Sequence, residues 1–324
     1  MTKVSRTPRK DVGPRASGTQ TLSVPRRTRV HPSDRQRRAI ALAAFLFTTG
    51  GQAVLVLLPA HLVLDLGLAP AAYGALGAVA VDTSVIALAV GRYLAGRTPG
   101  RLGLVSGGAS VAVVSAVLLL HCTQAAPLMA VLLVGTAALG LCHPAWRALT
   151  EVSGAADAAG TARRTGLVLG QLVALVAALL DEVPGGIVAG SCAGLLGVVV
   201  LALVVEDRRA PLAPRRSATL ARARASLEHA AVRQAAWYGL AAGSCLGCGA
   251  VAVAAMPGAD PLALTATSGL ATAVLVVTGK VLATRSTRAI RDDLAEAARS
   301  VVSHALLVGA AAAALVIGLA VQCR

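Results

Sequence analysis

The chain lacks the short motifs that identify the common classes of enzyme. It contains no G-x-S-x-G, no P-loop phrase and no H-E-x-x-H, which mark serine hydrolases, P-loop nucleotide hydrolases and zinc peptidases. We therefore expect no enzyme and no cofactor, and an ATP-driven pump would need a motor from another subunit. Aromatic residues make up only 2% of the 324 residues, so no aromatic stacking site is visible.

Cysteine is scarce as well, with six residues in the chain, of which Cys245 and Cys248 form a CxxC. A redox or metal-binding pair is one interpretation of this spacing. No second CxxC or CxxH is present to complete a zinc shell, which normally has four ligands. The flanking Ser244, Gly247 and Gly249 favour the other interpretation, small residues inside a helix. We expect no metal site.

Long apolar runs dominate what is present. Hydrophobic residues are 56% of the chain and its mean hydropathy is +0.72, whereas soluble domains are about 45–50% apolar. Runs of about twenty residues can cross roughly 30 Å of hydrocarbon, and strand-type alternation is absent. Because a backbone in lipid must satisfy its own hydrogen bonds, we predict an all-α polytopic membrane protein with about nine transmembrane helices. The predicted spans are 39–66, 71–91, 102–122, 127–146, 165–180, 185–205, 235–256, 262–283 and 301–321.

The net charge of +15 is spread over the N-terminal tail and the links between apolar runs. A concentrated basic patch would favour nucleic acid, whereas this distribution indicates cytoplasmic loops. With a cytoplasmic N-terminus, every Lys and Arg except Arg324 falls on the cytoplasmic side. Since Arg, Ala, Val and Gly are favoured as in GC-rich genomes, we expect a multi-pass protein of the bacterial inner (cell) membrane. Its expected partners are the lipid bilayer and a small-molecule substrate, with no nucleic acid.

Four segments follow from this pattern. Residues 1–38 are polar and rich in Arg, Pro, Ser and Thr, which predicts a disordered basic cytoplasmic tail because the segment cannot bury a core. Residues 39–205 are predicted to form a six-helix N-terminal bundle, and residues 235–324 a three-helix partial C-terminal bundle. Between them, residues 206–234 form a cytoplasmic linker. This linker is either an interfacial helix on the membrane surface or a plain solvated segment.

A small basic phrase occurs twice, each time directly after an apolar run. GRYLAGRTPGR covers residues 91–101, and GKVLATRSTR covers residues 279–288. At a constant offset, Gly91, Leu94, Ala95 and Arg97 recur as Gly279, Leu282, Ala283 and Arg285. The phrases close the second and the eighth predicted spans, so that the offset preserves orientation. This predicts parallel repeats related by an axis along the membrane normal.

On these residues the chain resembles the major facilitator superfamily, whose members carry a Gly-x-x-x-Asp-Arg-x-Gly-Arg-Arg phrase after the second helix and a weaker copy after the eighth. The match comprises Gly91, Leu94, Ala95, Arg97, Gly100 and Arg101. The Asp position holds Gly96, and the Thr98-Pro99 pair adds a residue. The resemblance implies a cytoplasmic gating motif made of Gly91, Arg92, Arg97, Gly100, Arg101, Gly279, Lys280 and Arg285.

A second resemblance lies in GTAALGLCHPAWRALTEV, residues 135–152, which is similar to the fourth helix of exporter-like members. It is carried by Gly135, Gly140, Pro144, Ala145, Trp146, Ala148 and Leu149. The resemblance implies two six-helix halves around a central cavity lined by helices one, four, seven and ten. The tenth has no predicted counterpart, so we expect a major-facilitator-like fold with an incomplete second half. Such a chain is a shortened relative, a truncated product, or part of an assembly in which a homo-oligomer or a partner subunit supplies the missing helices.

Three polar residues inside the predicted spans are candidates for substrate or proton coupling. An ionisable group in hydrocarbon costs at least about 2.5–3.5 kcal/mol. Asp82 is therefore either a proton-coupling carboxylate or a hydrogen-bonded group that ties two helices together. Gln52 and Gln171 either contact substrate or form an interhelical hydrogen bond.

Two functions follow from this sequence. The first is a secondary active transporter that exports a small organic molecule by proton coupling, with two helical bundles rocking about a midplane site. The alternative is a non-transporting membrane scaffold, accessory or regulatory protein derived from a transporter. The repeated phrase and the match in the fourth span indicate descent from a transporter. The missing motif Asp, the missing tenth span and the scarcity of polar residues favour the alternative.

Overall fold

The structure is a computed structural model, and it describes residues 34–97, 100–205, 220–256, 260–288 and 292–322, together with residues 258 and 290. The predicted tail up to residue 33, residues 98–99 of the first basic phrase and residues 206–219 of the predicted linker lie outside the described residues. The same holds for the side chain of Arg97 and for the burial of Gly96.

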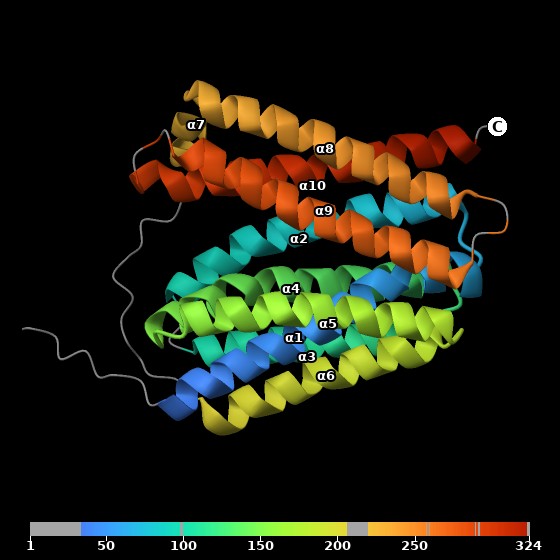
Figure 1. The fold of residues 1–324 in the computed structure, drawn as a ribbon, viewed down its shortest axis with the longest axis horizontal. Helices are drawn as coiled ribbons and strands as arrows, with labels where there is room; N and C mark the ends of the chain where they lie inside the picture. The colour runs from blue at the N-terminus through green and yellow to red at the C-terminus, as the bar shows by residue number, and fades with distance from the viewer. Residues whose placement is uncertain are drawn as a thin grey trace, which may run out of the picture. The chain divides into compact units, whose positions relative to one another are not determined.

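The regular structure of the described residues is helical (Figure 1). In chain order the elements are α1 (Asp34–Ala60), the short π-helix η1 (His61–Asp65), α2 (Pro70–Arg97), α3 (Arg101–Leu119), α4 (Ala125–Val152), α5 (Ala156–Leu179), α6 (Val183–Val204), α7 (Leu220–Leu227), α8 (Ala230–Ala254), α9 (Pro261–Thr287) and α10 (Asp292–Gln322). Over the described residues, nine helices are long and apolar enough to cross a membrane, with α1 and η1 forming one of them. The predicted all-α polytopic membrane protein is confirmed.

Most of these helices are longer than the apolar runs that predicted them. α5 begins at Ala156 rather than near residue 165, and α2 continues to Arg97 rather than ending near residue 91. Arg and Thr interrupt an apolar run without interrupting the backbone hydrogen bonds that define a helix. Long basic side chains also extend toward the membrane surface from a helix that is still continuous. The first basic phrase is therefore helical up to Arg97, and is not a link at that point.

Within the first six helices, α1 packs against both α5 and α6 through glycine. A side-chain carbon at Gly50 would lie 2.9 Å from the backbone nitrogen of Gly194 in α6. A side-chain carbon at Gly166 of α5 would lie 2.7 Å from the carbonyl oxygen of Phe45 in α1. Real Cβ atoms do not approach other atoms this closely, so glycine is what permits the short distance between these helices.

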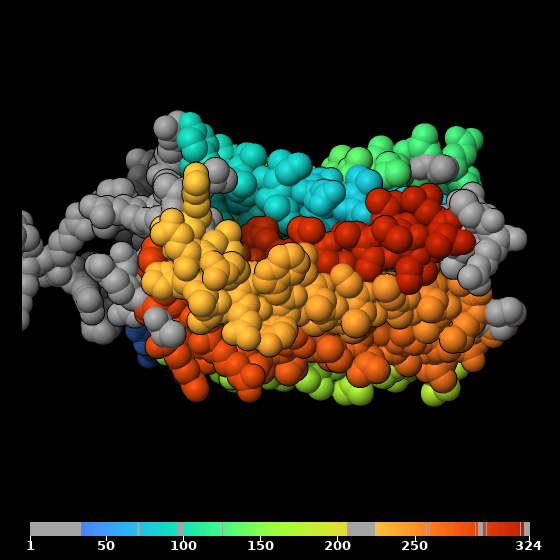
Figure 2. All heavy atoms as spheres, turned by 90° about the horizontal axis from the view of Figure 1, so that it is seen from above, coloured from blue at the N-terminus to red at the C-terminus, as the bar shows by residue number. Residues whose placement is uncertain are grey.

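The last helices pack by the same means. Gly243 and Gly247 of α8 lie against the backbone of α10 at Leu306 and Ala310. In the space-filling view, α10 lies between α8 and α2 (Figure 2), and Gly74 of α2 contacts the backbone of α10. α9 in turn packs against α8, α10, α1 and α5.

Two of these contacts have a counterpart in the other part of the chain. The glycine-packed pair α1 and α5 corresponds to the pair α8 and α10, and the contact of α2 with α10 corresponds to that of α9 with α5. A twofold relation that exchanges α1 with α8, α2 with α9, and α5 with α10 accounts for both correspondences. The pairing of α2 with α9 agrees with the repeated phrase, and α10 takes the place that α5 has in the first half.

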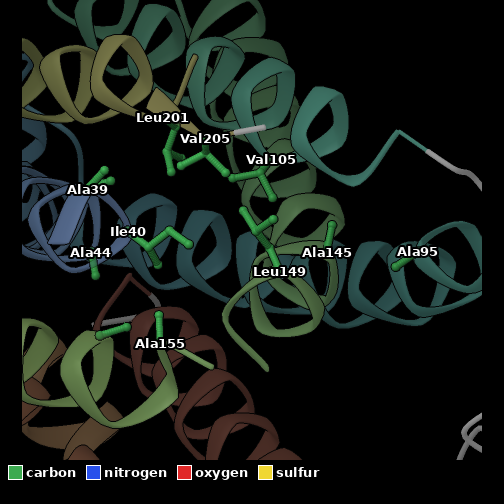
Figure 3. Close-up of a cluster of buried hydrophobic side chains, with 12 residues drawn as sticks. Ala39, Ile40, Ala44, Ala95, Val105, Ala145, Leu149, Ala155, Leu201 and Val205 are labelled. Carbon is green, nitrogen blue, oxygen red and sulfur yellow. The ribbon is translucent and has the colours of Figure 1, made fainter. Parts of the chain in front are cut away.

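An apolar cluster fills the end of the first six helices where their basic residues lie, which we call the basic end. Its fully buried members include Ile40 of α1, Val105 of α3 and Leu201 of α6. Their side chains point toward one another from these separate helices (Figure 3). Ala145 and Leu149 of α4 belong to the same cluster. The cluster therefore joins α1, α3, α4 and α6 at this end.

In the two copies of the basic phrase, replacing the first glycine by alanine is expected to affect stability differently. A side-chain carbon at Gly91 would lie 2.6 Å from the carbonyl oxygen of Leu141 in α4, whereas one at Gly279 would meet Leu306 Cδ2 at 3.6 Å, an ordinary contact. We expect Gly91→Ala to push α2 away from α4 and to destabilise the protein by about 1–3 kcal/mol, as overpacking does. Gly279→Ala should be close to neutral. The thermal midpoint of unfolding of each purified variant, with size-exclusion chromatography as the readout, checks this. Equal decreases of the midpoint in the two variants would contradict the packing described.

Candidate functional site

A cavity of about 420 Å³ lies among the first six helices. Its described lining comes from α1, α3, α4, α5 and α6, and includes Leu55, Val113, Leu139 and Leu167. This volume is within the range of small-molecule sites, which are mostly apolar with a few polar groups. α8, α9 and α10 contribute no residue to the described lining. We call this cavity the pocket.

Serine and threonine side chains supply part of the polar lining. Thr48 Oγ1 donates to the carbonyl of Ala44 at 2.7 Å, and Thr136 Oγ1 donates to that of Leu132 at 2.9 Å. These hydroxyls are therefore satisfied within their own helices. Ser191 of α6 differs, because it is 97% buried with an exposed fraction of 3%, and its Oγ has no hydrogen-bond partner among the described residues. A buried unpaired hydroxyl is costly unless a ligand or water pairs with it.

The two predicted glutamines are brought together. Gln52 is buried, lines the pocket, and donates from Nε2 to Oε1 of Gln171 at 3.2 Å. The Gln171 amide in turn lies directly against Gly269 of α9. If Gly269 carried a Cβ atom, the three atoms nearest to that Cβ would all belong to the Gln171 side chain. The interhelical hydrogen bond that the sequence left as one alternative is therefore present. It also connects the pocket wall to the last three helices.

Basic side chains surround the basic end of the pocket. His143 of α4 and Arg163 of α5 line it there, and the charges of Arg163, Arg147 and Arg92 all act on the imidazole of His143. Arg147 is paired with Glu151 at 3.2 Å, and Arg92 donates to Ser300 Oγ of α10 at 3.3 and 3.4 Å. Arg163 makes no hydrogen bond or ion pair with another described residue.

An aromatic pair that sequence reasoning missed also lines the pocket. The rings of Phe47 and Trp146 are 5.7 Å apart at an interplanar angle of 85°, the edge-to-face geometry that aromatic pairs prefer. With so few aromatic residues in the chain, composition gave no reason to expect two in contact. Their separation in sequence hides the pair, and only the match of Trp146 to the fourth helix of exporters pointed toward this region.

Asp82 lies away from the pocket. Its side chain is exposed on α2, does not line the pocket, and has no hydrogen bond or ion pair with another described residue. Gly74 and Ala78 lie on the same face of α2 as Asp82, at spacings of four residues. Gly74 contacts α10, and Ala78 is buried. Asp82 is therefore at the margin of the α2 surface that packs against α10.

The residues of the predicted gating motif are divided between two environments. Gly91 and Arg101 are buried, whereas Gly100, Lys280 and Arg285 are exposed. Arg92 of α2 contacts α10 by donating to Ser300 Oγ. In the described part of the chain no group of three His, Cys, Asp or Glu side chains is arranged to hold a metal ion, and Cys245 and Cys248 are free thiols.

The chain resembles known proteins in its fold and not in its sequence. No protein-family model and no curated protein matches the chain. The nucleoside transporter NupG matches with a TM-score of 0.65 and 10% identity, over 88% of this chain and 90% of that chain. A bacterial homologue of the human lysosomal transporter Spinster, in an inward-facing and unoccupied conformation, matches with a TM-score of 0.57 and 14% identity, over 89% and 80%. The chain has the fold of these two transporters.

The pocket differs from the cavity that this resemblance implied. We expected a central cavity lined by helices one, four, seven and ten. The described lining includes α1 and α4, the first and fourth spans, but its other members are α3, α5 and α6. The pocket therefore lies inside the first half, and one of its links to the second half passes through Gln171 and Gly269.

Because Gln171 lies against Gly269, we expect the effects of substituting these two residues on thermal stability to be non-additive. A methyl group at Gly269 collides with the Gln171 amide, so we expect Gly269→Ala to displace that amide, break its bond to Gln52 and lower the thermal midpoint of unfolding. In a Gln171→Ala background the colliding atoms are absent, and Gly269→Ala should then cost much less. Gly249→Ala, where a methyl group meets open space, is the control. Additive losses in the double variant would contradict this contact.

Proposed function

We propose that the protein is a secondary active transporter of a small organic molecule. One observation carries the proposal, namely an apolar pocket of about 420 Å³ with a few convergent polar groups inside a bundle that has a transporter fold. A scaffold protein gains nothing from an unpaired buried hydroxyl such as that of Ser191, whereas a bound substrate would satisfy it. This favours transport over the alternative of a non-transporting accessory protein.

The coupling and the direction belong to the same proposal. We propose that a proton gradient drives export across a bacterial inner membrane, with the N-terminus in the cytoplasm as the distribution of Lys and Arg favours. Asp82 is the acid nearest the middle of a predicted span, and it would carry the proton. It lies on α2 beside α10 rather than in the pocket, so proton binding and substrate binding would occur at separate places.

Transport is tested with the full chain in proteoliposomes that contain a pH-sensitive dye. Small organic compounds are added one at a time to vesicles with and without an imposed proton gradient. A transported compound should move protons only in vesicles that contain the protein, and an imposed gradient should drive its accumulation. If no compound in a broad panel produces either signal, while binding to the pocket is demonstrated separately, the scaffold alternative stands.

The role of Asp82 can be separated from folding and from binding. Asparagine keeps the shape and hydrogen bonding of this side chain but cannot change charge. We expect Asp82→Asn to abolish gradient-driven accumulation while substrate exchange without a gradient persists. The matched control is Asp157→Asn, because Asp157 lies in the first turn of α5, outside the predicted fifth span. If Asp82→Asn retains full gradient-driven transport, the proton is carried elsewhere.

A further inference from the structure

The charge of the pocket lining is one-sided. Arg163, whose guanidinium group is always charged, lines the pocket, and the described lining includes no Asp or Glu. Arg92 near His143 adds to the positive field at this end, whereas the charge of Arg147 is paired with that of Glu151. In an apolar pocket such a field attracts an anion and repels a cation, because low polarity strengthens electrostatic interactions.

Arg163 is the group best suited to bind the anion. Arg147 is engaged by Glu151 and Arg92 by Ser300, but Arg163 has neither kind of partner among the described residues. A guanidinium group presents a planar fork of donors that matches a carboxylate or another oxyanion. The next residue, Arg164, is also exposed but does not line the pocket. The position of Arg163 in the lining therefore distinguishes it from an ordinary basic residue at a helix end.

The rest of the lining selects an apolar body. Phe47 and Trp146 form an aromatic wall next to the basic residues, and leucine and valine side chains follow along α1, α3 and α4. Ser191 adds a single unpaired hydroxyl in a buried position. A volume of about 420 Å³ suits a drug-sized molecule and is too small for a phospholipid with two acyl chains.

We infer that the pocket takes a small organic anion with an apolar body, whose charged group lies at Arg163 and whose body packs against Phe47 and Trp146. The inference rests on the proposed function, since it names the substrate class of the same pocket. Binding and transport are measured separately, so one can fail without the other.

Trp146 offers a direct readout, because the chain has only two tryptophans and the other, Trp237, is exposed on α8. In a Trp237→Phe variant the emission of the full chain in detergent reports on the pocket alone. Three probes share one apolar body and differ in charge, namely 4-phenylbutyrate, 4-phenylbutanol and 4-phenylbutylamine. We expect the anion to bind about tenfold more tightly than the alcohol, as a charge-assisted contact that is partly screened by solvent would give. The amine should bind most weakly.

The matched variants Arg163→Gln and Arg164→Gln then show which arginine binds the anionic group of the probe. Each removes one positive charge from the same turn of α5, but only Arg163 lines the pocket. Arg163→Gln should abolish the preference for the anion, and Arg164→Gln should retain it. If Arg163→Gln fails to fold, Arg163→Lys, which keeps the charge but loses the fork, should retain part of the preference. Dioleoylphosphatidylglycerol, added in the same detergent, tests a lipid source of the anion and should not displace 4-phenylbutyrate.

Each remaining outcome counts against the inference. Equal binding of the three probes, or tightest binding of the amine, would overturn the anionic substrate class and leave the transporter proposal intact. Equal losses in Arg163→Gln and Arg164→Gln would remove Arg163 from the site. Displacement by the phospholipid would replace a small organic anion with a lipid, and the absence of any response at Trp146 would exclude the pocket as a site for this class.

Discussion

The close approach of helix backbones at glycine is the constraint on which the rest of the structure depends. In lipid, apolar side chains gain little by leaving the acyl chains for another helix, so helices associate through close packing and interhelical hydrogen bonds. α1 is held against α6 at Gly50 and Gly190, and against α5 at Gly166 and Gly170. At these positions the nearest atoms of the neighbouring helix are mostly backbone atoms, which cannot move aside as a flexible side chain can. Any side chain larger than hydrogen would therefore separate the helices.

The pocket is a consequence of where these contacts lie. One glycine-packed group consists of α1, α5 and α6, and a second consists of α2, α3 and α4, joined at Gly91, Gly108, Gly135 and Gly140. The two groups meet where α3 packs on α6 and where Phe47 contacts Trp146. Between α1 and α4, which belong to different groups, the described residues show no close approach of helix backbones at glycine, and there the pocket lies. Close packing within each group thus leaves space between the groups.

The sequence predicted those features that depend on composition and local spacing. Apolar runs predicted the all-α class and the nine candidate membrane-spanning helices of the described residues, and an interhelical hydrogen bond was one of the two alternatives that the sequence left for Gln52. Features that depend on distant residues meeting were not predictable in the same way. Phe47 and Trp146 are far apart in the chain, and so are Gln171 and Gly269, so that no local pattern reveals either contact. The predicted ends of α2 and α5 were wrong because charged side chains ended the apolar run before the helix ended.

The last three helices contact both helix groups that border the pocket, so a change in the distance between the groups would affect them. α9 contacts the first group, through Gln171 against Gly269, while α10 contacts the second group, through Gly74 and through Arg92 with Ser300. α9 and α10 also contact each other and share α8 as a neighbour. A ligand that changed the spacing between the two groups would have to shift α9 relative to α10, or strain the contacts at Gln171 and Arg92. The second half contributes no described residue to the pocket, and its contacts with both groups are the route by which a change in their spacing would reach it.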